Sequence, residues 1–261
     1  MQTHPDFRFD EGLFHQIGFE GDMAFTKSYL DIRQKEGRLY TDDVVLNLPK
    51  IKITSPHLKE WKIRRRSTNR LIRYLNAKQN AQVIEIGCGN GWLVNYLSKS
   101  LPFDFCGVDI NAVELKQATR LFGSNEKRSF VCADIFSSSF TGFPADVFIL
   151  AGGVVQYFSN LPALLQRLLK LLMPGGEIHI IDSPFYRNED LDTAKKRGRE
   201  HFKETGQSLM QNYYFYHQWE LLQSIPYELL YDPSSRYRRL KRLVITDSPF
   251  PWIKITKRKL D

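Results

Sequence analysis

The sequence predicts an α/β fold built around a parallel, doubly wound sheet. Short apolar segments alternate with helix-like segments between residues 83 and 182, a pattern that requires parallel strands joined by right-handed crossovers. The first apolar segment also runs directly into a glycine-rich turn, as in ligand-binding strand–turn–helix units. A chain of 261 residues, 42% of them hydrophobic, is long enough for one such core with additions.

Residues 1–54 show no sustained hydrophobic period and are interpreted as an irregular N-terminal extension. One helix is expected around Ala24–Gln34, and a short β-like segment at Val44–Leu46. Long segments with little regular structure are often functional when they are attached to a compact domain. The extension is therefore expected either to cover a binding site as a lid or to pack against the core.

A long helix is predicted to begin at Ser55-Pro56, because serine is favoured at the N-cap and proline at the first helical position. Apolar residues recur at helical intervals as far as Asn76.

The glycine-rich turn follows the apolar run that ends in Glu85. Its glycines, Gly87, Gly89 and Gly91, alternate with other residues, whereas a dinucleotide-binding loop reads Gly-x-Gly-x-x-Gly. The turn resembles the first motif of the class I S-adenosylmethionine-dependent methyltransferases. The resemblance implies a seven-stranded sheet whose last strand is antiparallel, within a cofactor-binding domain over residues 55–261. It also implies that S-adenosylmethionine is the cofactor.

The second and third strands are predicted at Phe103–Asp109 and Ser129–Asp134, and both end in an acidic residue. A helix over Asn111–Phe122 separates them. Because the second strand should lie alongside the first, Asp109 is placed to accept hydrogen bonds from two ribose hydroxyls; the alternative is an exposed turn aspartate. In the family resembled here, Asp134 would accept from the adenine amino group and Ile135 would donate its backbone N–H to the ring.

The fourth strand, Ala145–Ala151, opens into Gly152-Gly153, and the family places its acceptor substrate near this turn. Gln156 and Tyr157 are accordingly candidates for the acceptor pocket, although packing of the next helix is an equally good explanation. The expected cofactor-binding set is Glu85, Gly87, Cys88, Gly89, Asn90, Gly91, Asp109, Ile110, Asp134, Ile135, Ala151 and Gly152. In relatives the helix preceding the glycine turn lies beside the methionine end of the cofactor, so Lys62, Arg65 or Arg66 is a candidate partner for its carboxylate.

A leucine-rich helix is predicted over Leu161–Leu172, then a Pro-Gly-Gly stop and a fifth strand at Glu177–Asp182. Residues 185–213 are too long for a simple connection and are interpreted as an insertion that covers the acceptor, with a charged helix at Asn188–Thr205. His201 and His217 are weak candidates for a general base, against the alternative of ordinary surface histidines. No catalytic residue is assigned.

The C-terminal part is predicted to form a helix at Gln218–Ser224 and strands at Tyr227–Tyr231 and Trp252–Thr256. Between the two strands, Arg236–Ile245 is basic and amphipathic if it is helical. Such a segment can contact a membrane surface or a phosphorylated acceptor, or it can pack on the domain.

Positive charge is concentrated in a few clusters, while the whole chain carries a net charge of +8. The clusters are Lys62 with Arg64 to Arg66; Arg236, Arg238, Arg239, Lys241 and Arg242; and Lys254, Lys257, Arg258 and Lys259. They suit phosphate, nucleic acid or an anionic membrane, or they are solvated helix faces.

The three cysteines have neither zinc-site spacing nor an even count, so we expect buried thiols, no metal site and a reducing compartment. No apolar run is long enough to span a bilayer, and Met1–Asp6 lacks the features of a secretory signal. A cytoplasmic protein is therefore expected.

The activity predicted from this resemblance is methyl transfer to a small-molecule or saccharide-type acceptor, at oxygen or nitrogen. Two alternatives remain open at this point. The chain could be an RNA methyltransferase that uses its basic clusters as a phosphate track, or a cofactor-binding subunit without turnover. A nicotinamide oxidoreductase is the remaining formal alternative. The oligomeric state is left open.

Overall fold

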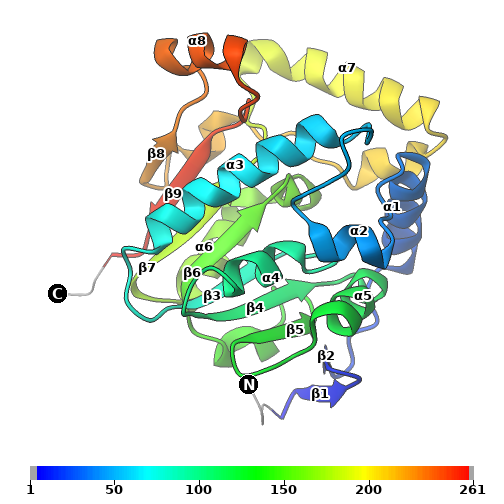
Figure 1. Cartoon of the computed structure of the whole chain (residues 1–261), viewed down its shortest axis with the longest axis vertical. Coiled ribbons are helices and arrows are strands. Elements are labelled where there is room, and N and C mark those ends of the chain that lie inside the picture. Colours follow the sequence, from blue (N-terminus) through cyan, green and yellow to red (C-terminus); the bar gives the residue numbers. More distant parts are fainter. Residues whose placement is uncertain (1–4, 259–261) are drawn as a thin grey trace.

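Nine strands form one mixed sheet in the computed structural model, which describes residues 5–258 (Figure 1). The strand order is β1-β2-β5-β4-β3-β6-β7-β9-β8. The central strands are β3 (Gln82–Ile86), β4 (Asp104–Asp109), β5 (Arg128–Cys132), β6 (Ala145–Ala151) and β7 (Leu172–Ile181), all parallel to their central neighbours. The last strand, β9 (Trp252–Thr256), runs antiparallel between β7 and β8 (Tyr227–Tyr231).

The sheet is covered on both faces, because successive side chains of its central strands alternate between two hydrophobic clusters. In β3, Val83 packs on one side and Ile84 on the other; in β6, Val147 and Phe148 divide in the same way. The first face is covered by α3 (Leu58–Leu75), α4 (Trp92–Ser98) and α5 (Ala112–Phe122), and the second by α6 (Leu161–Leu171). The doubly wound architecture is thus as predicted.

The number of strands was predicted incorrectly, because the N-terminal extension adds a hairpin to the sheet. Strands β1 (Phe7–Asp10) and β2 (Leu13–Gln16) are antiparallel to each other, and β2 continues the sheet by pairing in parallel with β5. Each strand has only four residues, too few to establish a period-2 pattern in the sequence. Leu13 is nevertheless almost fully buried, which anchors the hairpin.

The predicted helix in the extension is present as α1 (Met23–Lys35), capped by the Asp22 side chain, which accepts a hydrogen bond from the Phe25 amide. The β-like segment at Val44–Leu46 is wrong: these residues lie in α2 (Asp42–Asn47). Two aspartates in the first turn of α2 favour a helix there, since negative charge stabilises a helix N-terminus.

Most remaining boundaries differ from the predictions only locally. Helix α3 begins two residues later than expected, because the Ser55 hydroxyl accepts from the His57 amide in a preceding turn. The helix expected at Gln218–Ser224 is only the 3-10 turn η4 (Trp219–Leu222). Short 3-10 segments also occur at η1 (Ser138–Gly142) and η2 (Val154–Tyr157).

The insertion after β7 contains α7 (Asn188–Glu204) and η3 (Ser208–Asn212), and it packs against α1 of the N-terminal extension. Ile32, Phe202 and Met210 form the buried centre of this contact. Helix α8 (Arg236–Val244) lies in the connection from β8 to β9. Residues 1–4, part of the N-terminal segment without signal features, and Lys259 of the third basic cluster lie outside the described residues. Within residues 5–258, no helix is both long and apolar enough to span a bilayer.

Candidate active site

A pocket of about 590 Å³ lies at the carboxyl ends of the central strands. Open α/β sheets bind ligands at this edge, where the chain turns from strands to loops. Residues of the glycine turn, of the ends of β4 and β6 and of α3 form its inner walls, and residues of α1 and of the insertion form its outer wall. Eleven of the twelve residues expected to bind the cofactor line it, the exception being Gly91.

Gly91 lies in the turn between β3 and α4 and packs closely against β5 and α5. Its φ of +72° is in the left-handed region, and an added Cβ would lie 2.6 Å from Phe130 and 2.8 Å from Ala118. Gly87 is similarly constrained, because an added Cβ would lie 2.1 Å from the Val154 side chain. These two glycines therefore allow the turn to pack tightly, so that the backbone of residues 87–90 forms the pocket wall.

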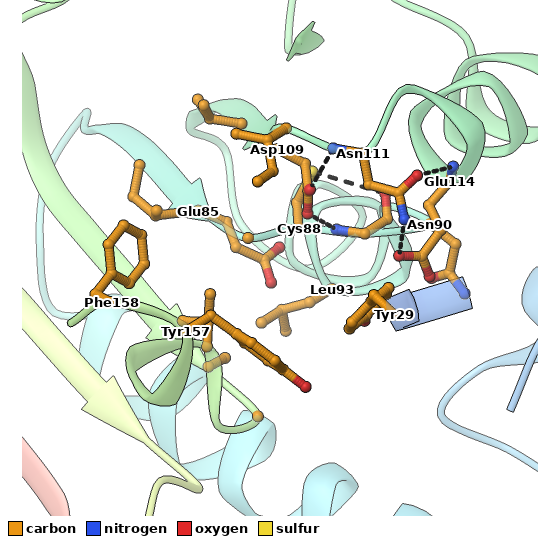
Figure 2. A pocket seen from close by; sticks show the side chains of 18 of the residues that line it. Tyr29, Glu85, Cys88, Asn90, Leu93, Asp109, Asn111, Glu114, Tyr157 and Phe158 are labelled. Carbon is orange, nitrogen blue, oxygen red and sulfur yellow. Dashed lines mark hydrogen bonds between the residues drawn. The ribbon is translucent and has the colours of Figure 1, made fainter. Parts of the chain in front are cut away.

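Glu85 presents a buried carboxyl group to the pocket, as Figure 2 shows. The residue is only 5% exposed, and its Oε2 has no hydrogen-bond partner among the described residues. Burial, reinforced by the neighbouring Asp109, raises the pKa of Glu85 well above its usual range. Buried polar atoms without partners are rare in proteins, and an unpaired carboxyl facing a cavity fits a cationic ligand group.

Asp109 is held at the tip of β4 by backbone amides. One oxygen accepts from Gly89 N at 2.7 Å and the other from Asn111 N at 2.8 Å (Figure 2). A carboxylate has about four acceptor positions, so each oxygen keeps one free for a ligand hydroxyl. Burial raises the pKa of Asp109.

Glu114 is a pocket residue that the sequence analysis missed. It lies in the first turn of α5, and its Oε2 accepts from Asn111 Nδ2 at 3.1 Å. Burial and the charge of Asp109 raise its pKa to about 7. An acidic residue five positions after a strand-end aspartate was the available signal, but exposed first-turn glutamates are common because they stabilise helix N-termini.

Asp134, at the end of β5, is supported by the N-terminal hairpin. Its backbone N–H donates to Gln16 Oε1 at 3.1 Å, and its side chain accepts from Phe136 N at 2.9 Å. Gln16, at the end of β2, also donates to the Ser137 hydroxyl. The hairpin therefore holds in place the turn that carries Asp134 and Ile135, a role that no sequence pattern indicated.

Arg64 lines the pocket, whereas the candidates Lys62, Arg65 and Arg66 are exposed and lie outside it. Helical phase explains the difference, since Arg64 falls three residues after the buried Trp61 and so faces the sheet. Its guanidinium pairs with Glu60 at 2.9 Å, and an added Cβ on Gly152 would lie 2.9 Å from its Nη1.

Aromatic side chains close the outer part of the pocket. Phe25 and Tyr29 of α1 meet Tyr157 edge-on, with ring centroids 5.7 and 5.6 Å from it, and Tyr213 of the insertion meets Phe25 at 5.2 Å. All four residues line the pocket. Burial raises the pKa values of both Tyr29 and Tyr157, so their phenols stay protonated at neutral pH.

The two candidate histidines lie outside the pocket. His217 is 2% exposed, and its Nε2 lies 2.8 Å from the Val155 carbonyl oxygen. His201 is exposed on α7, where its Nε2 lies 2.9 Å from Glu36 Oε1. Neither is positioned to accept a proton from a ligand in the pocket. Tyr157 is the one weak catalytic candidate that lines it.

Comparison with known proteins identifies a methyltransferase-like region in the middle of the chain. Residues 83–176 match the profile of a family described as "Methyltransferase domain". Phosphoethanolamine N-methyltransferase 1 of Zea mays is 27% identical over 137 residues, which cover 51% of this chain and 27% of the maize protein. Ribosomal RNA small subunit methyltransferase C of Pasteurella multocida is 27% identical over 130 residues, or 48% of this chain and 39% of that protein. The alignments thus span well under half of either relative.

A solved structure shows the same fold over most of the chain. The plantazolicin methyltransferase BpumL, in complex with SAH, has a TM-score of 0.53 and 19% identity, and the alignment covers 89% of this chain and all of that one. The central strand order and the matched domain agree with this likeness. The middle of the chain thus matches a methyltransferase domain in sequence, and the chain shares its fold with a solved methyltransferase, in agreement with the resemblance to the class I S-adenosylmethionine-dependent methyltransferases.

Proposed function

We propose that this protein transfers a methyl group from S-adenosylmethionine to a small-molecule acceptor, at oxygen or nitrogen. The observation that carries the proposal is the aromatic wall beside the residues expected to bind the cofactor, formed by Phe25, Tyr29, Tyr157 and Tyr213. A saccharide-type acceptor would suit such aromatic walls, which also carry the three phenolic hydroxyls of Tyr29, Tyr157 and Tyr213.

The residues of the inner wall fit the parts of the cofactor. Glu85 would hold the ammonium group with its unpaired oxygen, and Arg64 would hold the carboxylate. Asp109 would accept from the ribose hydroxyls through the acceptor positions that its two amide partners leave free. Asp134 and Ile135 would contact the adenine ring from the end of β5.

The bound sulfonium would supply a reactive methyl group and a neutral leaving group for an in-line displacement. The protein's task is then chiefly to align the acceptor atom with that methyl group and to exclude water. Tyr29 and Tyr157 can orient an acceptor by hydrogen bonds, but their raised pKa values make them poor proton acceptors at neutral pH. Methyl transfer to a neutral amine would need no general base. Transfer to a hydroxyl would need one, which would be either a group on the substrate itself or Glu114.

The cover favours a small acceptor over a folded RNA. Helix α1 and the insertion meet above the pocket, and Lys35 Nζ donates to the Thr205 carbonyl at 2.6 Å. A structured RNA would have to displace this contact to present a base. The ribosomal RNA enzyme among the relatives keeps RNA as the second candidate acceptor.

Two measurements test the proposal in sequence. Calorimetric titration should first show binding of S-adenosylmethionine and a much weaker response to NADH. Incubation with methyl-labelled cofactor should then label a product in a fractionated metabolite extract. Label recovered only in RNA would mean that the acceptor is RNA and not a small molecule. Binding of the cofactor without any labelled product would indicate a cofactor-binding subunit. The variant Tyr157→Phe should leave cofactor affinity unchanged while lowering turnover.

A further inference from the structure

We infer that α8 docks the protein onto an anionic membrane surface, beside the edge of the sheet that carries the pocket. The helix reads Arg-Tyr-Arg-Arg-Leu-Lys-Arg-Leu-Val over Arg236–Val244 and contains five basic residues and no acidic one. Its side chains at Tyr237, Leu240 and Val244 are 66%, 66% and 86% exposed. These positions are separated by three and four residues, so they share one face of the helix.

Helix α8 is anchored to the domain at the Tyr231 ring. Two guanidinium groups lie over the Tyr231 ring. The guanidinium carbon of Arg238, in α8, is 4.9 Å from the ring centre, and that of Arg70, in α3, is 4.2 Å from it. Arg70 also pairs with Asp247, which follows the helix. These contacts hold α8 in place while its apolar stripe stays in contact with solvent.

The basic surface around α8 is larger than the helix itself. Arg66 of α3 is exposed, and its positive charge acts on Asp247. The positive charge of Arg242, in α8, acts on Tyr231. The two acidic groups of the connection between β8 and β9 are engaged within the protein: Asp247 with Arg70, and Asp232 with the Ser234 hydroxyl and amide. The surface therefore carries an excess of arginine charge that an anionic partner would neutralise.

The combination of charge and exposed aliphatic side chains favours lipid over nucleic acid. Arginines would pair with either kind of phosphate. The exposed side chains of Leu240 and Val244 would make no favourable contact with the phosphate backbone of a nucleic acid. They can enter the acyl region of a bilayer when a basic amphipathic helix lies in its interface. Each arginine near an anionic surface strengthens attachment about fivefold, so a short helix of this composition suits reversible binding.

The position of α8 relates the docking surface to the pocket. Strand β8 ends at Tyr231 and the antiparallel β9 begins at Trp252, so the connection between them lies at the edge of the sheet where the parallel strands end. The pocket lies at the same edge. Figure 1 shows α8 at the periphery of this end of the molecule, beyond the sheet, together with α7. A membrane bound by α8 would therefore lie on the pocket's side of the molecule.

Vesicle flotation of the full chain tests this inference. Vesicles of phosphatidylcholine with about 30% phosphatidylglycerol should carry the protein upward, and pure phosphatidylcholine vesicles should carry little. Binding should weaken as salt is raised from 50 to 500 mM. The double variant Arg236→Gln/Arg239→Gln should reduce partitioning about 30-fold, and Leu240→Ser/Val244→Ser at least about tenfold.

Matched variants at the opposite edge of the sheet serve as controls. Lys99→Gln/Lys127→Gln removes two exposed charges there, and Met173→Ser removes a half-exposed apolar side chain at the start of β7. These controls should bind anionic vesicles like the unaltered protein, and all variants should keep its melting temperature. The inference is overturned if anionic vesicles do not bind, if the α8 and control variants lose binding equally, or if single-stranded RNA competes fully with the vesicles while the apolar variant binds normally.

Discussion

The buried carboxyl group of Glu85 leads to the sharpest prediction about cofactor binding. Replacing it by glutamine preserves its size and its acceptor for the Val94 amide, but it removes the charge that faces the pocket. A hydrogen bond to a charged partner contributes about 1.5–3 kcal/mol. Glu85→Gln should therefore weaken the binding of S-adenosylmethionine roughly 10- to 150-fold.

The same substitution should stabilise the protein in the absence of the cofactor. Because burial raises the pKa of Glu85, this carboxyl costs folding stability at every pH above its usual pKa, and the cost grows as the pH rises toward the raised value. A tenfold change in the acid dissociation constant corresponds to about 1.4 kcal/mol of folding free energy. Removing the ionisable group should therefore raise the melting temperature at pH 7, by about 2–4 °C for each kcal/mol regained.

Proton release provides an independent measurement. Pairing with the ligand ammonium would favour the ionised carboxylate, so binding should release protons at pH values below the raised pKa. Affinity should then rise with pH over that interval. Calorimetric titration in two buffers with different ionisation enthalpies measures the number of protons released, and Glu85→Gln should abolish the release.

Glu177→Gln is the matched control for Glu85→Gln. Glu177 is also buried, but it lies outside the pocket and pairs with Lys78 at 2.9 Å, His179 at 3.1 Å and Tyr74 at 3.0 Å. Its loss should lower stability by about 1–3 kcal/mol and leave cofactor affinity unchanged. The reasoning fails if Glu85→Gln binds the cofactor within twofold of the unaltered protein, or if it is less stable than the unaltered protein.

Three further changes test other parts of the structure. Asp109→Asn should weaken binding of S-adenosylmethionine about 10- to 100-fold in a calorimetric titration. It should also lower the free energy of unfolding by about 1–3 kcal/mol, because the new amide nitrogen cannot accept from one of the two backbone N–H groups. Gly91→Ala should lower the free energy of unfolding by roughly 2–5 kcal/mol in a urea titration, because the new Cβ would be strained at positive φ and would contact Phe130. Burial lowers the pKa of His179, whose Nδ1 accepts from Trp252 Nε1 at 3.0 Å, so its contribution to stability should be complete above about pH 6.5 and decrease as the pH falls below that value. Unfolding at pH 5 and pH 7 should reveal this loss, and His179→Gln should remove most of the difference.

The central layer of the fold could be predicted because local pattern and topology agree there. Glu85, Asp109 and Asp134 each end a short apolar strand, and parallel strands place their ends at one edge. Their meeting in one pocket therefore follows from the order of the elements alone. Their roles toward the cofactor remain predictions that the titrations above address.

Residues contributed by helix phase and by distant segments could not be predicted in this way. Arg64 and Arg65 are neighbours in the sequence, and only the exact rotation of α3 places one in the pocket and the other in solvent. Gln16 reaches the end of β5 through a hairpin of two four-residue strands, whose sequence carries too short a pattern to be recognised. Contacts between residues 118 positions apart depend on the packed structure, which no local propensity encodes.

The cover of the pocket is also formed by segments that are far apart in the sequence. Helix α1 belongs to one end of the chain and α7 to an insertion near the other, and they meet through Ile32, Phe202 and the Lys35–Thr205 hydrogen bond. Among the described residues, three buried side chains form the centre of this contact, with five partly buried aromatic side chains packed against them. Each cluster on the sheet has about two dozen buried side chains. Regions with few buried contacts open at lower free energy than the core. The cover is therefore the part of the protein expected to separate first, and its separation would admit an acceptor while the sheet and its strand ends remain intact.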